Sequence, residues 1–242
     1  MNLIIDAGNT SVKLAIFKKA EIVHLEIVVQ DDFVDGVKRI FDKYPKIHSA
    51  IVSSVGSLSK DKIKVVAVFC ELHELSHASK VPFKNSYTSP QTLGVDRLAL
   101  ITAAYYHNPH HNTLVIDAGT CITYDMLNDF DEYLGGAISP GIQMRYNAMH
   151  NQTAKLPLLE KTELIDYIGN STENCMHSGV IYGVKLELEG VINLYNSRFK
   201  DLTVILTGGD TLFLSKRVKN TIFADSKFLL KGLNYLLEYN KH

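Results

Sequence analysis

The stretch LIIDAG at residues 3–8 returns almost unchanged as LVIDAG at residues 114–119. In each copy a short apolar strand ends in Asp-Ala-Gly, and hydroxyl residues follow the glycine. Strand-like residues then resume, as VKLAIF at 12–17 and CITYDML at 121–127. A glycine between two strands is typical of a tight hairpin turn. Because the copies lie nearly half of the 242-residue chain apart, the repeat predicts a duplicated α/β fold of two similar lobes.

The remaining apolar patterns predict alternating strands and helices. Further strands are expected at residues 21–29, 49–55 and 203–206, and helices at residues 33–44, 94–107, 172–198 and 229–239. The first of these helices has Asp31 or Asp32 available as its N-cap. No low-complexity linker separates the halves. We therefore expect an N-terminal lobe of residues 1–112 and a C-terminal lobe of residues 113–242, closely packed with a cleft between them.

The composition is that of an ordinary globular protein and argues against several function classes. Hydrophobic residues make up 46% of the chain, and 25 basic against 26 acidic side chains leave a net charge of −1, which disfavours general nucleic-acid binding. Three widely spaced cysteines without a CxxC pair argue against a disulfide framework and a cysteine zinc site. The sequence has no apolar run of the roughly 20 residues that span a membrane and no secretory signal, so we expect a cytoplasmic setting.

The repeated turns are suited to binding phosphate. A glycine lets the backbone approach a ligand closely and exposes amide donors, and the hydroxyls that follow add further hydrogen bonds. A carboxylate cannot favourably touch phosphate, so Asp6 and Asp117 imply a bound cation. The alternative is that both aspartates are turn residues only. The pair Gly208-Gly209 adds a third glycine turn, whereas a Walker loop and a dinucleotide-binding fingerprint are missing from the sequence. These residues by themselves indicate a two-lobed phosphotransferase.

In order and spacing, these motifs resemble those of the type III pantothenate kinase family. That family lies within the acetate and sugar kinase, Hsp70 and actin superfamily, so the resemblance implies a duplicated ribonuclease-H-like, actin-like ATPase fold. The shared motifs cover nearly the whole chain: DAGNTSVK at 6–13, Tyr87, GVDR at 94–97, DAGTCIT at 117–123, GGAISPG at 135–141, STENCMHSG at 171–179 and LTGGD at 206–210. The resemblance implies ATP-dependent phosphorylation of pantothenate, the first step of coenzyme A biosynthesis. Cys121 and His177 stand where the family commonly has a small apolar residue and a glutamine.

Two neighbouring residues are the candidates for proton transfer and for substrate recognition. Phosphoryl transfer needs an oriented hydroxyl, a base to accept its proton and neutralised phosphate charge. Asp96 opens a predicted helix, so its residue type and position alone fit a helix-capping acid equally well. The family resemblance implies that Asp96 is the general base, and the helix dipole would keep its carboxylate ionised for that role. Arg97 is expected to bind the substrate carboxylate through a two-pronged contact, against the alternative of a surface ion pair.

The resemblance implies the rest of the site. The substrate-binding residues are Tyr87, Gly94, Val95, Asp96, Arg97 and Thr172. The ATP-binding residues are Asp6, Ala7, Gly8, Asn9, Thr10, Ser11, Val12, Lys13, Thr120, Gly208 and Gly209. Tyr87 has the alternative of an interior tyrosine with a satisfied hydroxyl, and Lys13 that of a residue facing solvent. Mg²⁺ is expected to accompany ATP, with Asp6 as a candidate ligand, and a monovalent cation, K⁺ or NH₄⁺, is expected at Asp117.

The helix expected at residues 172–198 is a candidate dimer interface. Its apolar stripe consists of Val180, Val184, Leu188, Val191 and Tyr195, and Gly179, Gly183 and Gly190 permit close backbone approach. A partner helix within the same chain is the alternative. The resemblance adds that Thr172 reaches pantothenate from the opposite subunit. The expectation is a homodimer with shared active sites.

Other readings of the sequence remain open. A nucleotide-binding regulatory protein without turnover, or another small-molecule kinase of the same superfamily, would share the phosphate turns. Only the GVDR helix start and Tyr87 speak against another kinase. The histidines at 107, 110 and 111 lack the spacing of a metal site and fit a solvated helix end better. Ser139 and Ser178 lack a GxSxG setting, so a serine hydrolase is not supported.

Overall fold

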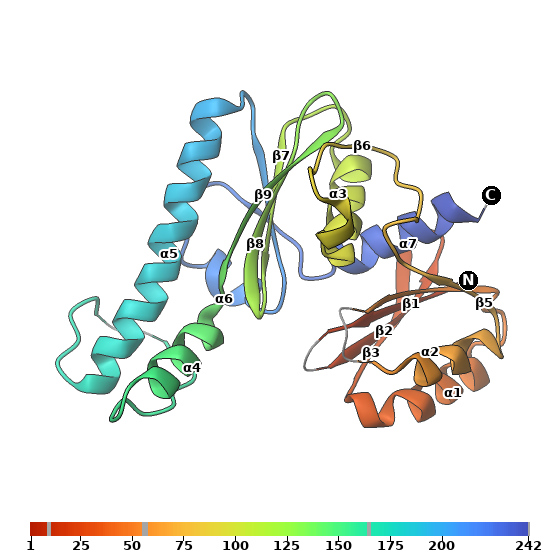
Figure 1. Cartoon of the computed structure of the whole chain (residues 1–242), viewed down its shortest axis with the longest axis horizontal. Coiled ribbons are helices and arrows are strands. Elements are labelled where there is room, and N and C mark those ends of the chain that lie inside the picture. The colour runs from red at the N-terminus through yellow and green to blue at the C-terminus, as the bar shows by residue number, and fades with distance from the viewer. Residues whose placement is uncertain (9–10, 55–57, 164–165, 242) are drawn as a thin grey trace. The chain divides into compact units, whose positions relative to one another are not determined.

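A computed structural model describes residues 1–8, 11–54, 58–163 and 166–241 (Figure 1). The chain forms two compact units. Unit 1 comprises Met1–Pro109, Asp131–Tyr133 and Lys227–His242, and unit 2 comprises His110–Phe130 and Leu134–Ser226. The lobe limits given from the sequence stay a prediction, and the return of the C-terminal helix to unit 1 was not part of it.

Unit 1 is built on a five-stranded sheet in the order β3-β2-β1-β4-β5. Its strands are β1 (Asn2–Ala7), β2 (Val12–Lys18), β3 (Glu21–Val28), β4 (Ser49–Ser54) and β5 (Glu71–Glu74). Strands β1 to β3 are antiparallel neighbours, whereas β4 runs parallel to β1 and β5 parallel to β4. The central strand β1 is buried along its whole length. A continuous apolar run is what a strand covered on both faces requires.

Helices cover the two faces of this sheet (Figure 1). They are α1 (Phe33–Lys43), α2 (Lys60–Ala67), α3 (Val95–His107) and α7 (Phe228–Asn240), with the short turns η1 (Gln30–Asp32) and η2 (Pro90–Thr92). Leu3 and Ile5 share a buried apolar cluster with residues of α1 and α2. Ile4 points to the opposite face and packs with residues of α3 and α7. The alternation along β1 therefore places the N-terminal end of α3, with Asp96 and Arg97, beside this sheet.

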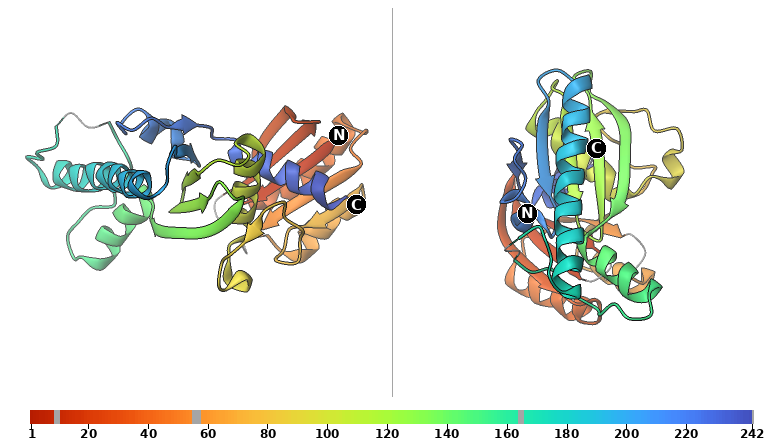
Figure 2. Two further views of the ribbon diagram at one scale, coloured as in Figure 1. Left: turned by 90° about the horizontal axis from the view of Figure 1, so that it is seen from above. Right: turned by 90° about the vertical axis from the view of Figure 1, so that its left-hand side faces the viewer.

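Unit 2 repeats this arrangement with its own elements. They are β7 (Thr113–Ala118), β8 (Cys121–Leu127), β9 (Glu132–Pro140), β10 (Thr203–Thr207), β11 (Phe223–Ala224), α4 (Ile142–Gln152), α5 (Thr172–Arg198) and α6 (Thr211–Ser215). The strand order is β11-β10-β7-β8-β9. Figure 2 shows α5 lying along one face of this sheet. The first two residues of β9, Glu132 and Tyr133, pair with β6 (Lys84–Asn85), and these four residues belong to unit 1.

The predicted duplication is confirmed by the two strand orders. β1 and β7 each form an antiparallel hairpin with the next strand and a parallel pair with a later strand, β4 or β10. The order β3-β2-β1-β4-β5 thus matches β9-β8-β7-β10-β11. This is the duplicated ribonuclease-H-like fold that the sequence predicted. The glycine after each DAG aspartate lies in the hairpin turn, as expected.

The apolar stripe of α5 packs on the sheet of its own unit, so the stripe does not support a dimer interface. Val180, Val184 and Leu188 are buried against the strands of unit 2, and Val191 and Tyr195 pack on the same cluster. Of the helix glycines, Gly183 faces the guanidinium of Arg145, which lies 4.0 Å from an added Cβ, whereas Gly179 and Gly190 have open space beside them. The core of unit 2 explains the stripe, and the homodimer stays a prediction.

Three further observations concern only the described residues. None of their helices is long and apolar enough to cross a membrane. Cys70, Cys121 and Cys175 are free thiols. No group of three or more His, Cys, Asp or Glu side chains within that part of the chain is arranged to hold a metal ion.

Candidate functional site

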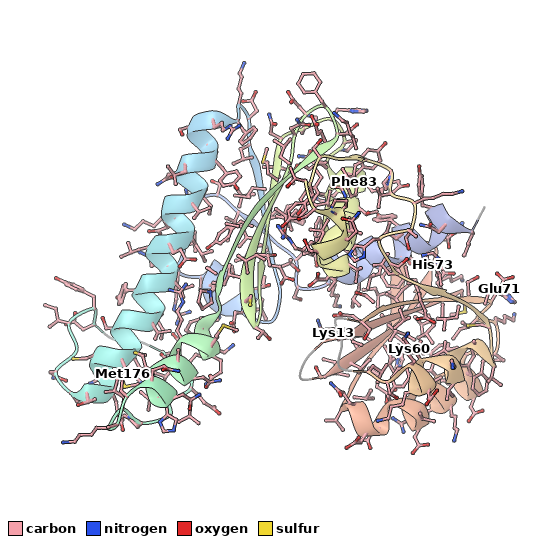
Figure 3. The ribbon with its side chains drawn as sticks, in the orientation of Figure 1. Lys13, Lys60, Glu71, His73, Phe83 and Met176 are labelled. Carbon is pink, nitrogen blue, oxygen red and sulfur yellow. The ribbon has the colours of Figure 1, made fainter. Side chains whose placement is uncertain are left out.

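The first DAG turn carries an internal ion pair. Asp6 ends β1 and lies opposite Lys13 of β2 in the hairpin register. The Lys13 Nζ atom is 3.0 Å from Asp6 Oδ2, and both side chains are at least half buried. Figure 3 labels Lys13 on its strand. Gly8 donates its N–H to the Ser11 carbonyl oxygen at 3.1 Å, which closes the turn. The amine of Lys13 is therefore directed to the first DAG turn, although the partly exposed side chain also meets solvent.

Two residues expected to bind ATP, Asn9 and Thr10, lie outside the described residues. Their neighbours Ala7 and Val12 are buried and paired with each other across the hairpin. Because both side chains are buried, they belong to the core beneath the turn and are not exposed to a ligand. The ATP-binding role of residues 6–13 stays a prediction.

The second DAG turn lies among hydroxyl groups. Asp117 ends β7 and is paired in register with Thr123 of β8 on one side and Thr207 of β10 on the other. Side chains of directly paired residues point to the same face of a sheet. The hydroxyl oxygens of Thr123 and Thr207 are buried, and neither has a hydrogen-bond partner within the described structure. The turn thus offers a carboxylate flanked by two buried hydroxyls.

The TGG turn packs directly against this second DAG turn. Gly208 has a φ of +95°, and a Cβ at this position would lie 2.3 Å from Asp117 Oδ1. Only glycine fits both the backbone conformation and the space. The next turn is fixed to the same strand, because Asp210 donates its N–H to the Ala118 carbonyl oxygen at 2.9 Å. The structure therefore brings together Asp117 and Gly208, which are far apart in the sequence, while Gly209 remains exposed.

Thr120 has its backbone held and its side chain exposed. Gly141, at the start of α4, donates its N–H to the Thr120 carbonyl oxygen at 3.1 Å. A Cβ on Gly141 would lie 2.1 Å from the Gly119 carbonyl oxygen, so the SPG segment touches the turn. With its carbonyl engaged, Thr120 presents its hydroxyl outward, as a phosphate-binding residue requires.

The start of α3 orients Asp96. Gly94 occupies the N-cap, and Arg97 donates its N–H both to the Gly94 carbonyl oxygen, at 3.1 Å, and to Asp96 Oδ1, at 2.9 Å. A Cβ on Gly94 would lie 2.4 Å from the same carboxylate oxygen. Asp96 therefore makes the local contact of a helix-start acid, and the helix dipole favours its charged form. The same contact fixes the direction of the carboxylate, which a general base also needs. Val95, beside it, is half buried.

Arg97 belongs to a buried stack of aromatic rings. It is only 4% exposed, which disfavours a surface ion pair. Its guanidinium carbon lies 5.6 Å from the centre of the Tyr87 ring. Tyr87 in turn stacks on the fully buried Tyr133, with ring centres 6.1 Å apart and planes 7° apart, and Phe83 meets Tyr133 edge-on. Figure 3 shows Phe83 in this region. Three residues from two of the sequence motifs thus lie in unit 1: Tyr87, and Asp96 and Arg97 of GVDR.

Thr172 lies at the start of α5, beside a pocket in unit 2. Ser171 caps the helix by accepting the N–H of Asn174 at 3.2 Å. The pocket, of about 750 Å³, is lined by Met149, Leu156, Gly169, Asn170, Ser171, Thr172, Cys175 and Met176. Figure 3 shows Met176 near this end of the helix. One turn further along, His177 shares a 2.8 Å hydrogen bond with the Tyr146 hydroxyl, whose pKa burial raises to about 12.

Sequence reasoning missed several residues around the expected site. Tyr133 supports the Tyr87 ring, and Thr123 and Thr207 flank Asp117. Glu132 accepts hydrogen bonds from Lys84, at 2.8 Å, and from Ser86, which anchors the segment just before Tyr87. Tyr133 and Glu132 stand in no motif, whereas Thr123 and Thr207 stand in the DAGTCIT and LTGGD motifs but were given no role beside Asp117. The positions of Thr123 and Thr207 beside Asp117 follow from the strand register, which is known only once β7 is paired with both β8 and β10.

The duplicated fold and its three glycine turns define the class of protein. It has the actin-like architecture of nucleotide-dependent phosphotransferases. Among solved structures, the chain is similar to a conserved Baf family protein from Campylobacter jejuni, with a TM-score of 0.67, 22% identity and 98% of each chain covered. It is also similar to a glucokinase from an Antarctic psychrotroph, with a TM-score of 0.53, 12% identity and 98% of each chain covered. These two likenesses concern the fold alone.

The sequence comparisons identify the family. The family model described as type III pantothenate kinase matches residues 2–194. The chain is 46% identical over 241 residues to the type III pantothenate kinase of Christiangramia forsetii, covering 100% of this chain and 99% of that protein. It is 45% identical to the one from Flavobacterium psychrophilum, with 100% of each covered. The chain belongs to the type III pantothenate kinase family.

Proposed function

We propose that the protein transfers the terminal phosphoryl group of ATP to the primary hydroxyl of pantothenate, the first step of coenzyme A biosynthesis. The observation that carries this proposal is the match to the type III pantothenate kinase family along the whole chain. The predicted substrate residues Tyr87, Asp96 and Arg97 lie together in unit 1. We expect the reaction to take place in the cytoplasm, where ATP and K⁺ are abundant.

The residues of α3 divide the work on pantothenate. Asp96 accepts the proton of the attacking hydroxyl, and its position in the first helical turn keeps it ionised for this task. Arg97 binds the pantothenate carboxylate. Because the guanidinium is buried, water competes little with that contact, and the fork geometry fixes the orientation of the substrate. Tyr87 stacks on the guanidinium and holds it in place.

The two DAG turns and the TGG turn would bind ATP. The amine of Lys13 suits the charged phosphates, and Thr120 offers an exposed side chain. Mg²⁺ bound with ATP neutralises the phosphate charge that develops during transfer. Asp6 is an oxygen donor of the kind Mg²⁺ prefers, although its pairing with Lys13 reduces its need for an ion. Gly208 and Gly209 allow the adenosine end to approach the backbone.

The second turn is the proposed site of the monovalent cation. The Asp117 carboxylate and the buried hydroxyls of Thr123 and Thr207 form a set of hard oxygen donors. Such a set suits K⁺, and NH₄⁺ can donate hydrogen bonds to the same oxygens. Thr123 and Thr207 would then gain the partners that buried hydroxyls require.

A homodimer with shared active sites is part of the proposal, now supported by a different face of α5. Leu186 and Leu194 on this helix are 60% and 70% exposed. Gly179 and Gly190 have open space beside them, which permits a partner to approach closely. Thr172 at the helix start would then contact pantothenate bound by the opposite subunit.

The two alternatives are less well supported. A regulatory protein without turnover would need neither the general base Asp96 nor the buried Arg97, because these residues are proposed to act on pantothenate and not on the nucleotide. Another small-molecule kinase of the superfamily would not give 46% identity to a type III pantothenate kinase along the full chain.

The test is a substrate panel. Purified protein is incubated with ATP, Mg²⁺ and K⁺ and with pantothenate, glucose, N-acetylmannosamine or acetate, and the products are identified by mass. Phosphorylated pantothenate alone is expected. A phosphorylated sugar or acid, or no phosphorylated product at all, would contradict the proposal. The Asp96→Asn variant serves as the control for a contaminating kinase.

A further inference from the structure

A carboxylate on α5, outside all of the motifs, joins four elements of unit 2. Oε1 of Glu187 accepts hydrogen bonds from the Tyr124 hydroxyl of β8 at 2.8 Å and from the Ser139 hydroxyl of β9 at 2.5 Å. Its Oε2 atom accepts a 2.5 Å hydrogen bond from Nη2 of the Arg145 guanidinium on α4. Glu187 is thus a single acceptor for three donors that come from separate elements.

The network holds Glu187 in its charged form. Burial opposes ionisation, but the hydrogen bonds from Ser139, Arg145 and Tyr124 together outweigh it, and the pKa of Glu187 is lowered. Burial and the bond to Glu187 raise the pKa of Tyr124, so its hydroxyl stays a donor. Hydrogen bonds to an ionised acceptor are roughly twice as strong as neutral ones. The Glu187 carboxylate is therefore a firm anchor at neutral pH.

The anchored segment is the one that touches the second phosphate turn. Arg145 also donates through Nε to the Pro140 carbonyl oxygen at 2.9 Å. On the other side of this short segment, Gly141 donates its N–H to the Thr120 carbonyl oxygen and leaves no room for a Cβ against the turn. Residues 139–141 therefore lie between the Glu187 network and the backbone of Thr120.

We propose that Glu187 is a positioning residue for ATP. By fixing Ser139 and Arg145 it sets residues 139–141, and these set the backbone of the Gly119-Thr120 turn in the conformation that receives the phosphates. The inference rests on the proposed function, in which Thr120 contacts ATP. Turns that bind phosphate work best when they need no reorganisation on binding. Glu187 contributes this preorganisation without touching the ligand.

The test compares variants that loosen the segment in steps. Ser139→Ala removes one donor, Glu187→Gln keeps the shape but loses the charge that faces Arg145, and Glu187→Ala removes the whole acceptor. Glu189→Gln is the matched control: it lies on the same helix and accepts the Lys219 N–H at 2.9 Å, away from residues 139–141. For each variant the Kd of ATP is measured without pantothenate, together with KM for both substrates and the melting temperature.

The expected result is a selective loss of ATP affinity. The Kd of ATP rises about tenfold in Glu187→Gln, because the loss of a hydrogen bond to a charged group costs about that much in affinity, and it rises further in Glu187→Ala. The KM for pantothenate stays within about twofold. A general loss of structure would raise both constants and lower the melting temperature in proportion. Glu189→Gln should bind ATP like the wild type.

Two results overturn the inference: an unchanged Kd of ATP in a folded Glu187→Gln protein, or equal rises in both KM values. If Glu187→Ala does not fold, Ser139→Ala tests the inference instead, because it deletes only a hydroxyl. The Kd of ATP is then expected to rise about threefold. A wild type that binds ATP but leaves pantothenate unphosphorylated contradicts the proposed function instead. The comparison of ATP affinities then still decides the role of Glu187.

Discussion

The two DAG turns have nearly the same sequence and the same place in the fold, but different electrostatics. In the first, the residue paired with the aspartate across the hairpin is Lys13, and its amine lies 3.0 Å from Asp6. In the second hairpin, the residue paired with Asp117 is Thr123. The same backbone arrangement thus places a lysine beside the aspartate in the first copy and a buried threonine hydroxyl beside it in the second.

If both turns bind phosphate as proposed, this difference separates two ways of placing positive charge beside it. A lysine on a strand is permanent but occupies one fixed position, whereas a carboxylate with hydroxyls can hold an exchangeable ion. Duplication supplied two equivalent turns, and a change of residue type at one register position was enough to give them different partners. The account therefore predicts ion dependence from the second turn and not from the first.

The largest effect is expected outside both turns. If the turns handle phosphate and neither moves a proton, Asp96→Asn should lose turnover by about 10²–10⁴-fold while ATP affinity is retained. The substitution is nearly isosteric and removes only the proton acceptor. Steady-state rates and an ATP titration measure the two quantities. More than half of the wild-type activity in this variant would assign the proton transfer elsewhere.

The second prediction concerns the proposed sharing of sites between subunits. Asp96→Asn and Thr172→Ala are each expected to be inactive. When equal amounts are mixed under conditions that allow subunit exchange, about a quarter of the wild-type activity should return, since half of the dimers are mixed and half of their sites are intact. Mass analysis of the mixed dimer confirms exchange. Exchange without recovery would place Thr172 in the same chain's site or outside the site.

A several-fold effect is expected from making the second turn resemble the first. Wild-type activity should fall when Na⁺ replaces K⁺ at fixed Mg²⁺, because the smaller ion fits an oxygen cage of this kind poorly. Thr123→Lys brings an amine to the position that Lys13 has in the first turn, so its activity should differ less between the two salts, as should that of Asp117→Asn. Thr123→Val, which only deletes the hydroxyl, is the control. If Thr123→Lys keeps the full salt difference, the comparison of the turns is wrong.

The smallest effect is a pH dependence of stability. The pKa of Glu187 is lowered in the folded protein, so its contribution is present above the pKa of an unfolded glutamate, about 4.3, and is lost as pH falls through the folded value. Glu187→Gln should cost about 1 kcal/mol in free energy of unfolding at pH 7 and less at acid pH. Urea denaturation at both pH values measures this, with the exposed Glu160→Gln as control. An equal cost at both pH values would show that the charge is unimportant.

The sequence predicted the fold well where a pattern is local. The repeat located both hairpins, and the strand at 121–127 and the helix at 172–198 agree with the structure at both ends. Packing partners could not be predicted in this way. The apolar stripe of α5 is the same whether its partner is a sheet of the same unit or another subunit, and nothing in α7 indicates that it covers the sheet of unit 1.

The candidate site shows the same limit. Asp117 was predicted from the repeated DAG turn, and Asp96 and Arg97 were predicted from the resemblance of the GVDR motif to the family; their roles stay predictions. Tyr133 and Glu187 could not be found, because a tyrosine in a strand and a glutamate in a helix are common, and only pairing and packing give them a role. Burial of Arg97 likewise depends on the rings around it rather than on its own motif.

The most direct test of the account follows both products of one reaction. Wild-type protein, ATP, Mg²⁺ and pantothenate are incubated in K⁺ or in Na⁺, and ADP and 4′-phosphopantothenate are quantified together. The account predicts one ADP for each 4′-phosphopantothenate and a higher rate in K⁺. ADP released without phosphorylated pantothenate, or equal rates in the two salts, would contradict it.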